Sequence, residues 1–159
     1  MKRQACMITL GAVLALAIAA PELSAQNADP VNGTWNLNLA KSKFSGSPPQ
    51  SETRTYEVSG DAVKTSTDRV DSQGKPVHTE SAPKYDGKDY PITGNPDADT
   101  VAVTRVDAYS TRSTLKKAGQ PVLRTTRSVA NDGKTMTITV NGTNAKGEKI
   151  DNVLVFDKQ

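Results

Sequence analysis

Four aspartates gather in the stretch KYDGKDYPITGNPDADTVAV, and closely spaced carboxylates are the oxygen ligands that Ca²⁺ prefers. They are Asp86, Asp89, Asp97 and Asp99. An EF-hand loop needs glycine at its sixth position and an acid at its twelfth, and counting from Asn95 these positions hold Thr100 and Val106. Two interpretations remain open: the carboxylates converge on a cation, or the Asp-Gly and Asn-Pro pairs form turns while the other aspartates solvate strand ends. We favour the turns and assign no metal ligand.

Nucleophilic and acid–base chemistry has few candidates in this chain. Cys6 is the one cysteine, His78 is the one histidine, and no Gly-x-Ser-x-Gly elbow is present. Glu80 and Ser81 follow His78 closely, but the polar segment around them predicts a surface or cross-strand histidine. Paired carboxylates for glycoside hydrolysis must flank a cleft, and no spacing here singles out one pair. We therefore assign no catalytic residue and no cofactor, and we predict a protein that is not an enzyme.

The elements that must position these side chains are short strands. The segment TMTITV shows the clearest two-residue period, with Met136, Ile138 and Val140 on one face and threonines on the other. Similar segments recur, separated by turn-forming clusters such as VSGD, DSQGK, YDGKD and NDGK. They are GTWNLNL, SETRTYEV, AVKTSTDRV, PVHTESAPKY, TVAVTRV, STRSTLKK, PVLRTTRSVA and DNVLVFDK. No window after residue 30 carries the period of a helix.

About 8–10 such strands predict an all-β fold, a single antiparallel meander closed into an up-and-down barrel, because closure removes strand edges. A partly open barrel or a two-sheet sandwich is the alternative. The expected inward set is Trp35, Leu37, Leu39, Tyr56, Val58, Val63, Val101, Val103, Leu115, Val122, Met136, Ile138, Val140, Val153 and Val155. This set holds few large side chains, so the barrel either encloses a cavity or is flattened and fills its own interior.

The segment NGTWNLNLAKS, with its Gly-x-Trp signature Gly33-Thr34-Trp35, resembles the first strand of the calycins, which include lipocalins, fatty-acid-binding proteins and avidins. The resemblance implies a barrel whose tryptophan plugs one end, packed beneath an arginine of a late strand. Here that arginine is Arg124 or Arg127, whose planar guanidinium can stack on indole. The resemblance also implies a small apolar or amphipathic ligand inside the barrel.

Aromatic side chains are the expected contacts with such a ligand. Tyr85 and Tyr90 bracket the sequence DGKD, which is typical of a tight turn, so we expect them side by side across a hairpin or at a barrel mouth. There they either stack on a ligand or cap the core at a sheet edge. The predicted ligand-binding residues are Trp35, Tyr56, Tyr85, Tyr90 and Arg124.

The chain begins with the layout of a secretory signal peptide. A basic start and an apolar segment, MKRQACMITLGAVLALAIAA, precede the small-residue site LSA. We expect residues 1–25 to be removed, residues 26–31 to form a flexible lead-in, and residues 32–159 to form one barrel domain in the periplasm or outside the cell. The apolar segment is too short for a lasting membrane span, so the processed protein is not expected to be an integral membrane protein. The segments GTW, YDGKDYP and VLVFDKQ together resemble small exported bacterial proteins.

The charge pattern limits the classes of partner that this protein is expected to bind. The formal net charge is +3 at pH 7 and the basic residues are scattered, which argues against a nucleic-acid-binding stripe. Three functional hypotheses follow: an exported, non-enzymatic barrel that binds a small apolar or amphipathic molecule, a filled barrel that serves as an inhibitor-like interaction or envelope module, and a carboxylate-based hydrolase. We favour the first.

Overall fold

The computed structural model describes residues 29–159, so the predicted signal peptide, residues 1–25, and residues 26–28 of the lead-in lie outside the described residues. The described chain forms ten strands and one 3₁₀ helix. They are β1 Gly33–Leu37, η1 Leu39–Lys41, β2 Ser51–Ser59, β3 Ala62–Val70, β4 Pro76–Ser81, β5 Asp86–Thr93, β6 Thr100–Arg105, β7 Ser110–Lys117, β8 Gln120–Val129, β9 Thr135–Thr143 and β10 Lys149–Lys158. Within these residues no helix has the length and apolar character that a membrane crossing requires.

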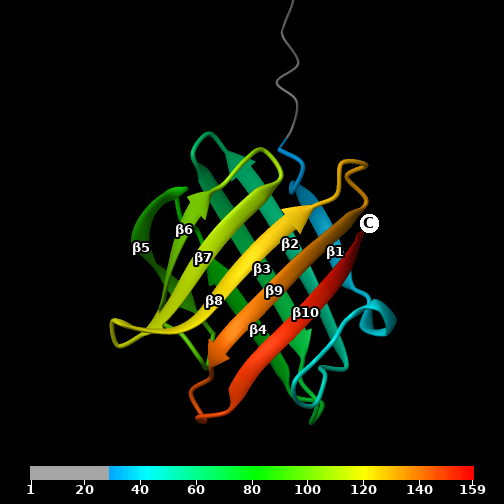
Figure 1. Cartoon of the computed structure of the whole chain (residues 1–159), viewed down its shortest axis with the longest axis vertical. Helices are drawn as coiled ribbons and strands as arrows, with labels where there is room; N and C mark the ends of the chain where they lie inside the picture. The colour runs from blue at the N-terminus through cyan, green and yellow to red at the C-terminus, as the bar shows by residue number, and fades with distance from the viewer. Residues whose placement is uncertain (1–28) are drawn as a thin grey trace, which may run out of the picture.

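The strands form a closed barrel in which each strand pairs antiparallel with the next, and β1 pairs with β10 to complete the ring (Figure 1). The closing register places Trp35 opposite Lys158 and Leu37 opposite Phe156. The prediction of an all-β, up-and-down meander is confirmed, and the sheet is a closed barrel rather than an open barrel or a sandwich. Closure pairs the first and last strands, whose edges would otherwise be exposed.

Strand β5 begins in the sequence DGKD, which was predicted to form a turn. Its pairing with β6 shifts between Asp86 and Asp89, and Gly87 lies between them with a φ of 76°. The prediction of a tight turn at DGKD is wrong, because this glycine serves a bulge within a strand and not a hairpin. Tyr85 and Tyr90 therefore do not face each other across a hairpin. Tyr85 packs against the core, whereas the Tyr90 hydroxyl donates to Asp86 Oδ2 at 3.0 Å.

The two-residue period decides which side chains enter the barrel. On β10 the buried side chains are Leu154 and Phe156, so the prediction that Val153 and Val155 face inward is wrong. On β8 the buried side chain is Leu123, so the prediction that Val122 faces inward is also wrong by one position. In both strands apolar residues occupy adjacent positions, so the period alone does not choose the inward face.

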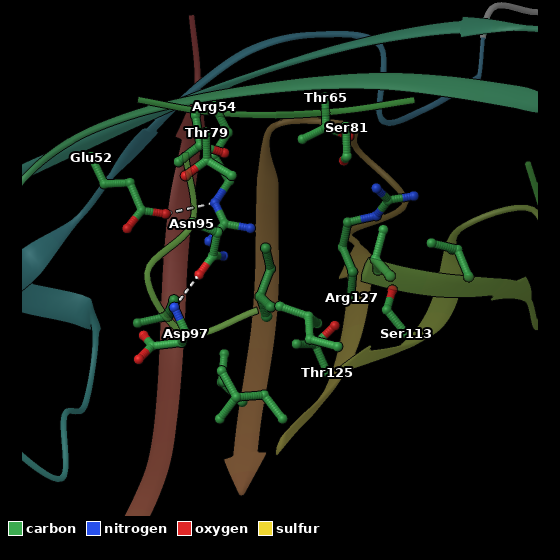
Figure 2. Close-up of a pocket in the computed structure, with 18 of the residues that line it drawn as sticks. Glu52, Arg54, Thr65, Thr79, Ser81, Asn95, Asp97, Ser113, Thr125 and Arg127 are labelled. Atoms are coloured by element: carbon green, nitrogen blue, oxygen red, sulfur yellow. Dashed lines mark hydrogen bonds and ion pairs between the residues drawn. The ribbon is translucent and has the colours of Figure 1, made fainter. Parts of the chain in front are cut away.

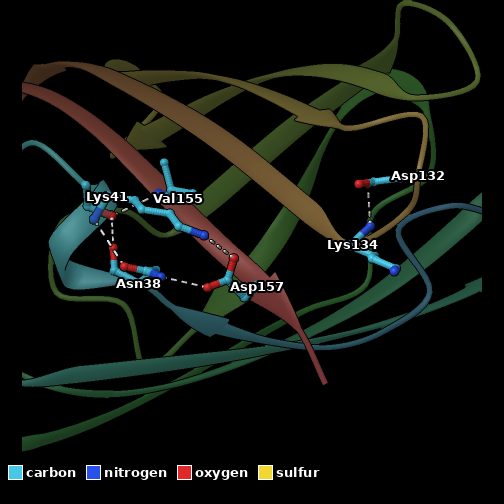
Figure 3. Close-up of polar contacts among 7 residues, drawn as sticks. Asn38, Lys41, Asp132, Lys134, Val155 and Asp157 are labelled. Carbon is cyan, nitrogen blue, oxygen red and sulfur yellow. Dashed lines mark hydrogen bonds and ion pairs between the residues drawn. The ribbon is translucent and has the colours of Figure 1, made fainter.

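The segment after β1 lies alongside β10 (Figure 3). Asn38 Nδ2 donates to Asp157 Oδ2 at 2.7 Å, and Lys41 Nζ donates to Asp157 Oδ1 at 3.1 Å. The hydrogen bond from Asn38, followed by that from Lys41, lowers the pKa of Asp157. The backbone of Lys43 then pairs with that of Val153 on β10 in an isolated antiparallel β-bridge. Leu39, expected to face inward, lies in η1 and is 42% exposed, because the chain leaves the barrel wall at this point.

Candidate functional site

One end of the barrel is closed by side chains from β1 and from the residues just before it. Trp35 is fully buried, and its Nε1 donates to the Val31 carbonyl at 2.7 Å. Val31, Phe156 and Met136 are buried in the same cluster, and we call these four side chains the end plug. The cation above the indole is Lys158, whose Nζ lies 5.0 Å from the ring centroid, and not an arginine of β8.

A cavity of about 270 Å³ occupies the interior beside the end plug (Figure 2). It shares Tyr56, Ile138 and Leu154 with the core. Seven serine and threonine side chains line it, namely Thr65, Thr67, Thr79, Ser81, Thr111, Ser113 and Thr125. Valine, leucine and isoleucine side chains supply the apolar part of the wall. The cavity is therefore amphipathic, and it is roughly twice the ~150 Å³ of an engineered cavity that holds benzene.

Two charged residues of β2 form an ion pair in the cavity wall. Glu52 is only 5% exposed and accepts a hydrogen bond from Arg54 Nε at 2.6 Å. The two residues are two positions apart in a strand and so lie on the same face. Burial is the largest single influence and disfavours the charge on Arg54, but the Glu52 carboxylate and Tyr56 together outweigh burial and raise the pKa of Arg54, which stays charged. The carboxylate and the guanidinium neutralise each other inside the wall.

Arg127 of β8 also lines the cavity, and its charge has no such partner. Its Cζ lies 4.8 Å from the centroid of the Tyr56 ring. Within residues 29–159 no ion pair joins it to a carboxylate, and its buried Nε has no hydrogen-bond partner. A buried donor without an acceptor costs roughly 1–3 kcal/mol, and stacking on the ring offsets part of this. An anionic group in the cavity would supply both the acceptor and the opposite charge.

The loop between β5 and β6 closes part of the other end of the cavity. Asn95 and Asp97 of this loop line the cavity, and Ala98 is only 1% exposed. Asn95 Oδ1 accepts from the Asp97 N–H at 2.8 Å, which shapes the loop (Figure 2). Asp97 Oδ1 accepts from the N–H of Ala145, in the loop between β9 and β10, at 3.1 Å. Because these loops belong to different hairpins, this bond ties two parts of the mouth together.

The five residues predicted to bind a ligand lie in different parts of the barrel. Tyr56 lines the cavity beneath Arg127. Trp35 belongs to the end plug, and Tyr85 packs on the core with a buried hydroxyl that has no hydrogen-bond partner in residues 29–159. Tyr90 is half-buried on β5, and Arg124 is exposed on β8. The structure thus brings Tyr56 to the cavity and leaves the other four outside its wall.

Glu52 and Arg54 are not among the residues predicted from the sequence to bind a ligand, and Arg127 is predicted only as a candidate partner for the tryptophan. A signal for the first two was present in SETRTYEV, where they share the two-residue period with Tyr56. For Arg127 the signal was its even spacing from Leu123, which places both side chains on the same face of β8. This signal can be used only once the inward face of β8 is known.

The four aspartates considered as possible Ca²⁺ ligands, Asp86, Asp89, Asp97 and Asp99, do not form a common cluster. Each accepts a hydrogen bond from a different donor. These donors are Lys88 N for Asp86, Lys116 Nζ for Asp89, Ala145 N for Asp97 and Ala118 N for Asp99. In the part of the chain that the structure describes, no group of three or more His, Cys, Asp or Glu side chains is arranged to hold a metal ion.

Comparisons with known proteins concern the fold. No protein-family model and no curated protein matches the chain. Among solved structures, it is similar to the zebrafish ileal bile acid-binding protein complexed with cholic acid, at 12% identity and a TM-score of 0.46, over 82% of this chain and 99% of that one. It is also similar to a de novo designed fluorescence-activating β-barrel, at 11% identity and a TM-score of 0.44, over 83% of this chain and 99% of that one.

Proposed function

We propose that this protein is a non-enzymatic barrel that binds a small amphipathic organic anion in its interior. The observation that carries the proposal is Arg127, a guanidinium in the cavity wall whose buried Nε lacks an acceptor within residues 29–159. Proteins rarely leave buried polar groups unpaired, so each exception calls for an explanation, and a binding role is one. A ligand carboxylate beside Arg127 would make a charge-assisted hydrogen bond and remove the penalty.

The rest of the wall fits such a molecule. Val101, Leu123 and Leu154 offer apolar surface to a hydrocarbon body. The hydroxyls of residues such as Ser81 and Ser113 can donate to or accept from polar substituents. The volume of about 270 Å³ favours a ligand of one or two rings over a long-chain lipid.

The cavity is also what favours binding over the other two hypotheses. A filled barrel that acts as an interaction module has no use for a hollow interior of this size with an amphipathic wall. A carboxylate-based hydrolase needs an acid that is available to exchange protons, whereas the Glu52 carboxylate is bonded to Arg54 at 2.6 Å. Export to the periplasm or the medium remains part of the proposal, on the strength of the N-terminal sequence.

Isothermal titration calorimetry with 2-naphthoate and its neutral amide tests the proposal. A charge-assisted hydrogen bond contributes about 1.5–3 kcal/mol, so naphthoate should bind roughly 10–100-fold more tightly than the amide. Arg127→Met should remove this difference, whereas Arg112→Met, at an exposed position on β7, should preserve it. Equal affinity for the two compounds, or an Arg127→Met variant that still prefers the anion, would contradict the proposal.

A further inference from the structure

We infer that Glu52 makes the interior selective for singly charged anions over doubly charged ones. The inference rests on the proposed function and adds the charge class of its ligand. It starts from the charged side chains that line the cavity, which are Glu52, Arg54, Arg69, Asp97 and Arg127. Three are basic and two are acidic, so the wall carries one net positive charge.

The Glu52–Arg54 pair determines where that charge lies. Glu52 is 5% exposed and bonded to Arg54 Nε at 2.6 Å, so the positive charge of Arg54 is already compensated within the wall. Arg127 has no compensating carboxylate among residues 29–159, and its buried Nε has no acceptor there. At the mouth, Arg69 is half-buried directly opposite Glu52 in the β2–β3 register, so Glu52 faces this second guanidinium as well. Asp97 is also half-buried there, and its Oδ1 accepts from the Ala145 N–H.

The selectivity follows from the cost of burying charge. A first carboxylate placed beside Arg127 brings the cavity to neutrality, and buried charges are tolerated when they are paired in this way. A second carboxylate would compete with Glu52 for Arg54, and two carboxylates beside one guanidinium repel each other in a low-dielectric interior. Glu52 thus occupies the counter-charge that a dianion would need, and it disfavours the wrong ligand by keeping Arg54 compensated.

The replacement Glu52→Gln tests the effect of the negative charge of Glu52 on ligand selectivity. The glutamine amide oxygen can still accept from Arg54 Nε, while the negative charge is removed and the wall carries two net positive charges. A matched control is the double replacement Glu52→Met with Arg54→Met, which deletes the pair together and leaves the net charge of the wall unchanged. Replacing both members of a buried pair with apolar residues is often neutral or stabilising, so this second variant is expected to fold.

The probes are two molecules of nearly equal size, 6-carbamoyl-2-naphthoate with one charge and naphthalene-2,6-dicarboxylate with two. By titration calorimetry at pH 7.5, the unaltered protein should bind the monoanion at least about tenfold more tightly than the dianion. Glu52→Gln should reduce this preference to less than about threefold or reverse it, and the pair deletion should retain it. Thermal unfolding of each variant verifies that it is folded.

The outcomes separate this inference from the proposed function. Equal binding of both probes to the unaltered protein would overturn the selectivity while leaving anion binding intact. The selectivity would also be overturned if Glu52→Gln kept the full preference for the monoanion, or if the folded pair deletion lost that preference. If neither probe binds and 2-naphthoate also fails to bind, the proposed function itself is wrong, and the inference that rests on it is wrong as well.

Discussion

Replacing Arg127 by methionine should make the unliganded protein more stable. Arg127 lies in the cavity wall with a buried Nε that has no acceptor in residues 29–159, and its Cζ is 4.8 Å from the Tyr56 ring centroid. Methionine is similar in length, adapts to irregular apolar surroundings and carries no donor that needs a partner. The replacement therefore removes an unsatisfied group without opening a large void.

The magnitude follows from two opposing contributions. Removing a buried donor that lacks an acceptor gains roughly 1–3 kcal/mol. Losing the stacking of the guanidinium on the Tyr56 ring costs about 0.5–2 kcal/mol. The net gain in the free energy of unfolding is about 1 kcal/mol, which corresponds to a rise in Tm of roughly 3–5 °C for a domain of this size.

Urea and thermal unfolding followed by circular dichroism measure this difference, with Arg112→Met as the matched control. Because Arg112 is exposed, its replacement should change stability by less than about 0.5 kcal/mol. Adding 2-naphthoate at about 100 times the Kd of the unaltered protein should stabilise that protein by about 2.7 kcal/mol. Arg127→Met, which should bind naphthoate about 10–100-fold more weakly, should gain only about 0.4–1.4 kcal/mol, so the order of stability reverses. A variant that is less stable than the unaltered protein by more than about 1 kcal/mol without ligand would refute this reasoning, since Arg127 would then support the fold.

Three further predictions concern the fold. Trp35→Ala should cost about 3–5 kcal/mol in urea unfolding, because it empties the end plug; a loss below about 1 kcal/mol would mean that the indole is peripheral. Gly94→Ala should cost more than about 3 kcal/mol, since its Cβ would lie 1.9 Å from the His78 carbonyl oxygen. Gly60→Ala, with φ of +61° but open space, should cost only about 1–2 kcal/mol, and equal losses at the two glycines would contradict the packing. The hydrogen bond that His78 Nδ1 donates to the Asp68 carboxylate raises the pKa of His78, so its stabilising effect should be fully present below pH ~6.5 and lost as pH rises through the higher folded-state pKa. His78→Gln should remove this component from stability measured across that range, and an unchanged profile would show that the pair contributes nothing.

The strands of the barrel could be predicted because the alternation of apolar and polar residues that specifies them is a local pattern. Alternation in segments such as TMTITV specifies strands, and Met136 and Ile138 are buried as expected. Strand β5 was not predictable, because Asp86-Gly87 is equally suited to a hairpin turn and to the bulge that the structure contains. Its pairing with β6, which is a non-local contact, decides between the two.

The site was less predictable than the fold. On β10 the run VLVF offers two apolar faces, so the inward position of Leu154 depends on the register with β9 and β1. Glu52 and Arg54 alternate with threonines in a strand that is polar on both faces, which gives no local reason to place charges inside. The unpaired state of Arg127 is a property of the assembled cavity and cannot be read from β8 alone.

A crystal structure of the protein with 2-naphthoate tests the central claim most directly. We predict the naphthalene ring inside the barrel and a carboxylate oxygen about 2.7–2.9 Å from a guanidinium nitrogen of Arg127, the usual length of a charge-assisted hydrogen bond. A naphthoate bound on the outer surface, or inside the barrel with its carboxylate away from Arg127, would contradict the assignment of this arginine as the anion-binding group.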